Sequence, residues 1–321
     1  MSATGSRALA SLASPPETAE DSEPGRVRLG REVPELPQAA KDKTRHAAAA
    51  AERVFLFLEE PEEVPDTAEP VPSSEINGSV YFAHVHFGYV PEKTIINDFS
   101  AIVQPGTKVA IVGPTGAGKT TMVKLLMRFY DVDSGSITLS GRNVRDFDRS
   151  DLREGFGMVL QDTWLFQGTI MENIRYGRLD ATDEEVIAAA RAANVDHFIQ
   201  TLPGAYQMEL NEDATNISQG QKQLLTIARA ILADNKILIL DEATSSVDTR
   251  TEQRIQTAMD NLMRGRTSFV IAHRLSTIKN ADLILVMKDG DIVEQGKHEE
   301  LLAKGGFYAE LYNSQFEDVT A

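Results

Sequence analysis

The sequence predicts an α/β fold with a parallel sheet, on two observations. First, from about residue 78 onward, short apolar runs alternate with helix-like segments, an order typical of α/β domains. Second, the runs at 236–240, 268–272 and 283–287 are compact and apolar, as strands buried on both faces of a parallel sheet are. Between the first two runs, the segment 250–264 places its apolar residues on one helical face. We therefore expect strand–helix–strand units around one hydrophobic core.

The elements before these follow from the same periodicities. We expect strands at 95–103, 107–112, 137–139 and 156–160. Helices are expected at 118–130 and 182–194. The second helix has a clear start signal, because Thr182 is followed three residues later by Glu185, which is the spacing of a capping box.

Composition excludes several classes of protein. The 321 residues carry a net charge of −16, and 42% of them are hydrophobic, which is enough for one large or two modest domains. No apolar run reaches the roughly 18–20 residues of a membrane helix, and the lack of cysteine excludes a disulfide scaffold or a thiolate zinc site. The acidic charge argues against binding to nucleic acid. We expect an acidic, globular, cytoplasmic protein.

Residues 1–75 differ from the rest and are predicted to be largely disordered. They contain 9 of the 13 prolines and 8 Lys+Arg against 15 Asp+Glu, so they cannot bury enough apolar area to offset the entropy of ordering. The Ala-rich segment 47–58 is an exception with two interpretations: a short helix ending before Pro61, or a transient helix in a linker. We expect one folded domain at 76–316 and a tail at 317–321.

The first chemical motif is a phosphate-binding loop. The segment Gly113-Pro-Thr-Gly-Ala-Gly-Lys-Thr120 matches G-x-x-x-x-G-K-[ST] and lies between a predicted strand and a predicted helix. Glycines let backbone amides wrap phosphate oxygens, and the helix N-terminus adds partial positive charge. Lys119 should reach the β- and γ-phosphates, and the Thr120 hydroxyl should coordinate Mg²⁺. The loop predicts a nucleoside triphosphate bound by Gly113, Thr115, Gly116, Ala117, Gly118, Lys119, Thr120 and Thr121.

The second motif is a pair of carboxylates after a buried strand. The run 236–240 delivers Asp241 to its carboxyl end, which is where open α/β sheets bind ligands. Asp241 can hold Mg²⁺ through water, and Glu242 is placed to accept a proton from an attacking water. An Asp-Glu pair after a strand is often only a solvated turn, but together with the phosphate loop the catalytic interpretation is favoured.

The third motif begins at Ser218 and reveals a family resemblance. Ser218 and Gln221 form a capping box, which alone indicates only a well-capped helix. The order of phosphate loop, Ser-x-Gly-Gln and Asp-Glu, however, resembles that of the ATP-binding cassette (ABC) ATPases. The resemblance extends to Gln161 after the strand 156–160, to Asp248 and to His273. Tyr89, upstream of the phosphate loop, matches the aromatic residue that stacks on adenine in that family.

Within that family, the chain resembles the nucleotide-binding domains of multidrug and lipid exporters. The strings Asp241-Glu-Ala-Thr-Ser-Ser-Val-Asp248, Arg128-Phe-Tyr-Asp131 and Ile271-Ala-His-Arg-Leu275 are typical of them. The resemblance, over about 78–316, implies a P-loop NTPase (RecA-like) core with a mostly parallel sheet and an antiparallel β subdomain. It also implies a helical subdomain at about 162–232 that carries the signature motif. In these exporters an Ala-rich segment leaves the last membrane helix, so 47–58 resembles the remnant of such a linker.

The resemblance also implies a role for each site residue. Tyr89 stacks on adenine, and Mg²⁺ is held directly by Thr120 and Gln161 and through water by Asp241. Glu242 is the general base, while His273 contacts the γ-phosphate and orients the attacking water. The resemblance further implies a head-to-tail dimer of two identical or two different chains. In it, the ATP site of one chain is completed by Ser218, Gln219, Gly220 and Gln221 of the other. Asp248 lies at the same dimer interface.

The sequence departs from the exporter pattern at two places. Gln219 stands where glycine is commonest, and Ala214-Thr215-Asn216 replaces a Gly-Glu pair that normally contacts the membrane subunit. Trp164 and Phe166 have two interpretations, as core residues or as contacts to the coupling helices of a membrane partner.

Three functions remain as hypotheses. The first is an ATPase that powers export, held at the inner face of the cell membrane by a transmembrane partner that this sequence does not contain. The second is a truncated cassette that binds and hydrolyses ATP without driving transport. The third is a soluble cassette ATPase acting on nucleic acid or ribosomes, which the acidic charge and the single cassette disfavour.

Overall fold

The computed structural model describes residues 38–60, 62–161, 163–241, 248–272 and 274–316. The chain divides into two units, one up to Glu63 and one from Val64 onward. Within the first, helix α1 (Gln38–Leu58) ends where the sequence predicts but begins nine residues earlier, because 38–46 is also rich in helix-forming residues. Its last five residues, Val54–Leu58, are apolar and each more than half exposed. Among the described helices, 21-residue α1 included, none combines the length and apolar character needed to cross a membrane.

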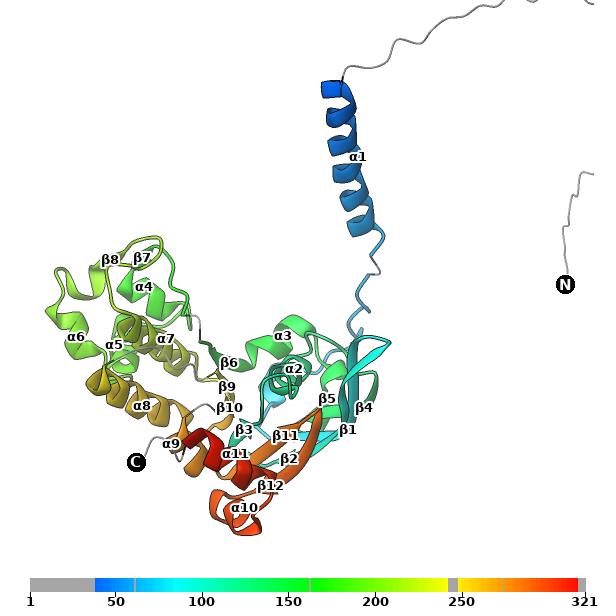
Figure 1. The fold of residues 1–321 in the computed structure, drawn as a ribbon. Coiled ribbons are helices and arrows are strands. Elements are labelled where there is room, and N and C mark those ends of the chain that lie inside the picture. Colours follow the sequence, from blue (N-terminus) through cyan, green and yellow to red (C-terminus); the bar gives the residue numbers. More distant parts are fainter. Residues whose placement is uncertain (1–37, 61, 162, 242–247, 273, 317–321) are drawn as a thin grey trace, which may run out of the picture. The chain divides into compact units, whose positions relative to one another are not determined.

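The second unit is built on a six-stranded sheet with the order β12-β11-β3-β10-β9-β6 (Figure 1). Neighbouring strands are parallel except β12, which runs antiparallel to β11. The strands are β3 (Lys108–Val112), β6 (Phe156–Val159), β9 (Ile237–Asp241), β10 (Thr267–Ile271), β11 (Leu283–Lys288) and β12 (Asp291–Gly296). The predicted α/β fold with a mostly parallel sheet is confirmed.

The two faces of this sheet belong to two hydrophobic clusters, because successive residues of a strand point to opposite sides. On β3, Ala110 and Val112 pack with the helices α7 (Gln219–Ala233) and α8 (Thr249–Met263). Val109 and Ile111 face the other way and pack with α2 (Lys119–Leu126). The sheet is therefore buried on both faces, which explains why its strands read as continuous apolar runs.

A second, antiparallel sheet covers the α2 side, with the order β2-β1-β4-β5. Its strands are β1 (Val80–Val90), β2 (Lys93–Val103), β4 (Ser134–Leu139) and β5 (Arg142–Asn143). The sequence predicted parts of β2 and β4 but not β1. Register shifts between Phe82 and Gly88 interrupt the alternation of β1, so its buried side chains do not follow a simple period of two.

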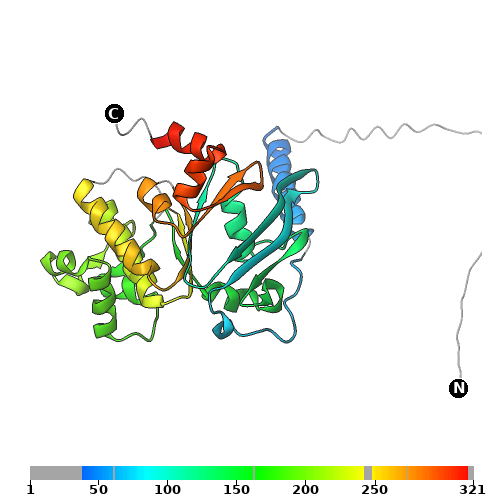
Figure 2. The same ribbon diagram turned by 90° about the horizontal axis from the view of Figure 1, so that it is seen from below.

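A group of helices lies at the opposite end of the unit from the antiparallel sheet, as both views show (Figure 1, Figure 2). With α7 it contains α4 (Ile170–Arg175), α5 (Asp183–Ala192), α6 (Asp196–Thr201) and a short ribbon of β7 (Gly168–Thr169) and β8 (Glu209–Leu210). The predicted capping box at the start of α5 is present, since the Thr182 side chain accepts from the Glu185 amide. The remaining elements are η1 (Ser73–Glu75), η2 (Val144–Asp146), α3 (Arg149–Glu154), η3 (Ala205–Gln207), α9 (Leu275–Lys279), α10 (His298–Lys304) and α11 (Phe307–Phe316).

Two expectations need correction, and the same buried arginine is involved in both. Helix α2 ends at Leu126 rather than near residue 130, and Arg128 adopts a left-handed conformation with φ 51°. The Arg128 side chain is only 4% exposed and pairs with Asp66 at 3.1 Å and Asp131 at 3.2 Å. Asp66 also pairs with Arg149 at 2.7 Å. These pairs attach the segment from Val64 to the folded unit, which therefore begins before residue 76.

Candidate functional site

The predicted site residues gather at the carboxyl edge of the parallel sheet. Strand β3 ends at Val112 and leads into Gly113, whereas β9 ends at Asp241. In the parallel pairing, Ile111 lies opposite Ile271, and Ile271 lies opposite Asp241. On the far side of β9, Val159 lies opposite Leu240, so Gln161 emerges at the same edge. The phosphate loop, Asp241 and Gln161 thus leave neighbouring strands on one side of the sheet.

The loop from Gly113 to Gly118 has a backbone that requires glycine at both ends. Gly113 has φ 153°, and a Cβ there would lie 2.2 Å from the Met287 carbonyl oxygen. Gly118 has φ 97° and precedes the first residue of α2; a Cβ there would lie 2.8 Å from Ile96 Cδ1. At Gly113 a side chain would collide with the backbone of β11, and at Gly118 the left-handed backbone disfavours any other residue. The close approach of the β11 backbone therefore requires glycine at the start of the loop.

Lys119 is folded back onto this loop. Its Nζ donates hydrogen bonds to the carbonyl oxygens of Gly113 at 2.7 Å and Pro114 at 2.9 Å. Burial lowers the pKa of the Lys119 ammonium, and the negative charge of Asp241 partly opposes that shift. The cation of the loop and the carboxylate at the end of β9 thus act on each other. Thr120 is exposed one residue further along α2, while Thr121 is buried.

Tyr89 packs against helix α2 within an aromatic cluster. Its hydroxyl is hydrogen-bonded to Thr121 Oγ1 at 3.2 Å, and its ring meets those of Phe87 and Tyr130 edge-on at 5.0 and 5.1 Å. Lys124 Nζ lies 5.7 Å from the ring centroid. The side chain is fixed at several points yet 43% exposed, so a planar ligand can reach it. Sequence reasoning missed Tyr130 as a neighbour, although the Arg128-Phe-Tyr-Asp131 string contains it.

A cavity of about 130 Å³ adjoins the phosphate loop. Gly113, Pro114, Thr115 and Lys119 line one side of it, and Tyr308, Leu311 and Tyr312 of α11 line another. No motif in the sequence indicates a role for α11. Its place beside the loop results from tertiary packing, since α11 follows the loop by almost two hundred residues.

Three predicted magnesium ligands present oxygen atoms of different kinds. Thr120 offers a hydroxyl, Gln161 an amide carbonyl and Asp241 a carboxylate, and Mg²⁺ prefers oxygen ligands and keeps several non-protein ones. Within the described ranges, no cluster of three His, Cys, Asp or Glu side chains could hold a metal by itself. A site with few protein oxygens fits a magnesium ion that phosphate oxygens also bind.

Two of the predicted catalytic residues, Glu242 and His273, lie outside the described residues. Asp248 is described and caps α8, because its carboxylate accepts a hydrogen bond from the Thr251 amide at 3.0 Å. A hydrogen bond from the Thr251 side chain, together with this bond from its amide, lowers the pKa of Asp248.

The predicted signature segment begins helix α7. Ser218 and Gln221 form the expected capping box, in which the Gln221 side chain accepts from the Ser218 amide at 2.8 Å. Gln219 Nε2 donates to Thr163 Oγ1 at 3.0 Å, which connects the segment to the loop after Gln161. Gly220 is buried, whereas Ser218 and Gln219 are exposed. In the part of the chain that the structure covers, no hydrogen bond or ion pair joins Ser218–Gln221 to the phosphate loop.

The residues after Gln161 form an exposed aromatic patch. Trp164, 62% exposed, lies 6.0 Å from Phe166 and 6.5 Å from Tyr176 between ring centroids. The Arg229 guanidinium lies 5.3 Å from the Tyr176 ring and also donates to the Trp164 carbonyl. Of the two interpretations offered for Trp164, burial in the core is wrong.

Comparison with known proteins identifies the family. A family model described as ABC transporter matches residues 96–245. The fatty acid ABC transporter ATP-binding/permease protein of Mycobacterium bovis is 57% identical over 263 residues, which are 82% of this chain and 41% of that protein. The ATP-dependent lipid A-core flippase of Desulfotalea psychrophila is 48% identical over 267 residues, 83% of this chain and 46% of that protein.

A solved structure gives the same result. A bacterial Atm1-family ABC exporter with ATP bound superposes with a TM-score of 0.74 and 41% sequence identity, over 85% of this chain and 48% of that one. The chain thus spans less than half the length of the relatives it matches. On the site geometry and these similarities together, the chain carries the ATP-binding domain, an ATPase domain, of an ABC transporter of the exporter type.

Proposed function

We propose that this chain binds and hydrolyses Mg²⁺–ATP to power the export of a substrate through a membrane domain. The observation that carries the proposal is the carboxyl edge of the sheet, where Lys119 and Asp241 act on each other beside a preformed phosphate loop. A cation and a carboxylate at the same edge of the sheet suit a ligand that brings both phosphate charge and a metal ion.

The proposed division of labour follows from residue type and place. The loop amides and Lys119 bind the β- and γ-phosphates, and Tyr89 stacks on adenine. Thr120, Gln161 and Asp241 hold Mg²⁺, which neutralises phosphate charge when bound. Glu242 takes a proton from the attacking water, and His273 orients that water.

We further propose that two copies, identical or different, enclose two ATP molecules head to tail. Ser218 and Gln219 are exposed at the start of α7 and make no hydrogen bond to the phosphate loop of their own chain within the described residues. A helix N-terminus with exposed donors is suited to a γ-phosphate that another subunit presents. The two-fold arrangement makes each site composite.

The membrane partner is proposed from two exposed apolar surfaces. Trp164 and Tyr176 form one, next to the Gln161 loop. The other is Val54–Leu58 at the end of α1, where exporters have the linker from their last membrane helix. Aromatic and aliphatic side chains exposed in groups mark contact sites. A partner of this kind would hold the domain at the inner face of a membrane.

The relatives suggest the class of substrate. The fatty acid ABC transporter of Mycobacterium bovis and the lipid A-core flippase of Desulfotalea psychrophila share 57% and 48% identity with this chain. We propose an amphiphilic lipid with acyl chains. The runner-up remains a cassette that hydrolyses ATP without driving transport.

A chimaera tests the export proposal. This chain's cassette replaces the ATP-binding domain of the Mycobacterium bovis relative, and ATP-dependent movement of a fluorescent fatty acid is followed in proteoliposomes. We expect transport by the chimaera. A matched Glu242→Gln chimaera should lose it, because loss of a general base slows hydrolysis by about 10²–10⁴-fold. ATP hydrolysis without transport, while the intact relative transports, would favour the runner-up.

A further inference from the structure

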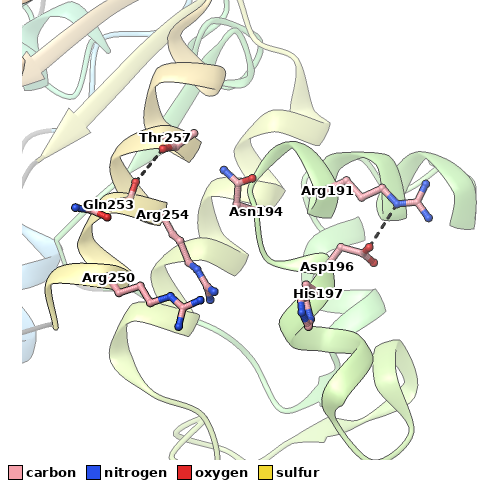
Figure 3. Close-up of a pocket in the computed structure, with 8 residues that line it drawn as sticks. All are labelled: Arg191, Asn194, Asp196, His197, Arg250, Gln253, Arg254 and Thr257. Carbon is pink, nitrogen blue, oxygen red and sulfur yellow. Dashed lines mark hydrogen bonds and ion pairs between the residues drawn. The ribbon is translucent and has the colours of Figure 1, made fainter.

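A larger cavity, of about 570 Å³, lies between helix α8 and the end of the α5–α6 pair (Figure 3). Helix α8 contributes Arg250, Gln253 and Arg254, and the facing wall contributes Asn194, Asp196 and His197. None of these residues belongs to the phosphate loop or to the nucleotide site described above. The volume lies in the range of pockets that bind small ligands.

The walls of this cavity are held in place by the core. On α8, Ile255, Ala258 and Met259 are buried among the helices, so the polar face of α8 turns toward the cavity. At the far end of the helix, Asn261 Nδ2 donates to the Ala192 carbonyl at 2.9 Å and ties α8 to the end of α5. The cavity is therefore an open recess between helices that the core holds in place, and all of its lining residues except Asp196 are exposed.

Two exposed arginines of this cavity have no side-chain partner among the described residues. Arg250 and Arg254 lie one turn apart on α8, and their guanidinium groups extend into the space toward His197 (Figure 3). Among the described residues, neither guanidinium has a hydrogen bond or an ion pair. By contrast, Arg128 and Arg266 pair with carboxylates at 3.1 and 2.6 Å. Two like charges at this spacing disfavour the helix, so a bound anion would relieve their repulsion.

The one carboxylate of the lining does not neutralise this pair. Asp196 accepts a hydrogen bond from the Tyr206 hydroxyl at 2.7 Å and pairs with Arg191 at 3.4 Å. Arg191, a third arginine of the lining, is turned toward Asp196 (Figure 3). Because Arg191 and Asp196 neutralise each other, Arg250 and Arg254 leave the lining with an excess of two positive charges, in a chain whose net charge is −16.

We propose that this cavity binds a small soluble anion with two linked phosphate groups. A guanidinium fork binds phosphate oxygens bidentately, and two forks one turn apart suit two phosphates. Asn194, Gln253 and His197 add hydrogen-bonding groups on the opposite and adjoining walls. The lining contains no Trp, Tyr or Phe to stack a base, so the cavity favours a phosphate-rich molecule over a nucleotide. The site bridges α8, which Asp248 caps, and the helical group that carries Ser218.

Inorganic pyrophosphate is the probe, titrated calorimetrically at constant ionic strength. Every chain carries Lys119→Ala, which weakens competing binding of the probe at the phosphate loop. The test variants are Arg250→Gln and Arg254→Gln. The matched control is Arg264→Gln, which removes the same charge from an exposed arginine at the end of the same helix, outside the cavity. Thermal unfolding of each variant checks that it is folded.

We expect one saturable site in the reference chain and in Arg264→Gln. Each test variant should bind about tenfold more weakly or worse, as loss of a hydrogen bond between charged groups predicts. Arg254→Lys keeps the charge but loses the fork, so its affinity should be intermediate. Equal affinity in all variants, an equal loss in Arg264→Gln, or no saturable binding to the reference chain would overturn the proposal.

Discussion

The Lys119 ammonium donates to the carbonyl oxygen of Gly113 at 2.7 Å, so the cation of the phosphate loop is held by the first residue of that loop. A second bond, to the Pro114 carbonyl at 2.9 Å, completes the arrangement. In the proposed nucleotide complex, the β- and γ-phosphates would replace these carbonyls as partners of Lys119. Because the exchange trades neutral acceptors for charged ones, it favours the nucleotide-bound state.

Lys119→Ala should weaken nucleotide binding and hydrolysis together. A hydrogen bond to a charged group contributes about 1.5–3 kcal/mol, so affinity should fall roughly 10- to 150-fold. Equilibrium titration with a fluorescent ATP analogue at fixed Mg²⁺ measures this. Lys304→Ala, an exposed lysine of α10, is the control and should bind normally. Normal affinity in Lys119→Ala would contradict the assignment.

The pH dependence of ATP binding should report the same lysine. Burial lowers the pKa of Lys119, with Asp241 opposing part of the shift. Lys119 therefore loses its proton at a lower pH than an exposed lysine, and ATP affinity should decline over that range as the pH rises. Lys119→Arg stays protonated throughout, so its affinity should hold to higher pH. Identical alkaline profiles for the two chains would show that Lys119 does not titrate in binding.

Tyr89→Ala should raise KM for ATP and largely spare kcat, because adenine stacking is similar before and during the reaction. Stacking on an aromatic ring contributes about 1–3 kcal/mol, which corresponds to roughly a 5- to 150-fold change in KM. Tyr89→Phe keeps the ring and loses only the hydrogen bond to Thr121, so it should change KM less. Steady-state kinetics measure KM and kcat for each variant, and Tyr81→Ala on the same strand is the control. A loss mainly in kcat would refute stacking.

Asp66→Ala should destabilise the folded unit. Asp66 pairs with Arg128 and Arg149, whose side chains are 4% and 8% exposed, so the variant leaves two buried cations with fewer partners. Because Asp66 itself is 26% exposed, we expect a loss of about 1–3 kcal/mol in the free energy of unfolding, measured in urea. Glu69→Ala removes the same charge from an exposed site nearby and should be neutral. If Asp66→Ala were as stable as the unmodified chain, Asp66 would not hold the segment from Val64 to the folded unit.

Local signals explain which parts of the fold and the site could be predicted. The strands β3, β9, β10 and β11 were predicted within a residue or two, because burial on both faces leaves an unmistakable apolar run. The phosphate loop and the cap at Ser218 depend on short sequence spacing, so their geometry followed as well.

Features that depend on distant contacts escaped sequence reasoning. The early end of α2 reflects the burial of Arg128 against Asp66, which is 62 residues away in the sequence. The place of Tyr308 and Tyr312 beside the phosphate loop depends on the packing of α11. The contact of Gln219 with Thr163 joins segments 56 residues apart. No periodicity or local motif encodes such pairs.

The central claim is that the ATP site is completed by a second copy of the signature segment. ATP then links two chains, and without a membrane partner to keep them close, dimerisation should limit the rate. Mixing Ser218→Arg chains with Glu242→Gln chains should restore one working site per mixed dimer, because both defects then fall in the same composite site and leave the other site intact. Loss of the Ser218 cap destabilises α7 by about 1 kcal/mol, so the folding of that variant is checked first.

The most direct measurement is the specific ATPase activity of the unmodified chain over a dilution series, with its oligomeric state followed by sedimentation at each concentration. The account predicts that activity per molecule falls on dilution, together with the dimer fraction. Constant specific activity down to nanomolar concentration, with the chain monomeric throughout, would mean that one chain holds a complete catalytic site, and it would contradict the account.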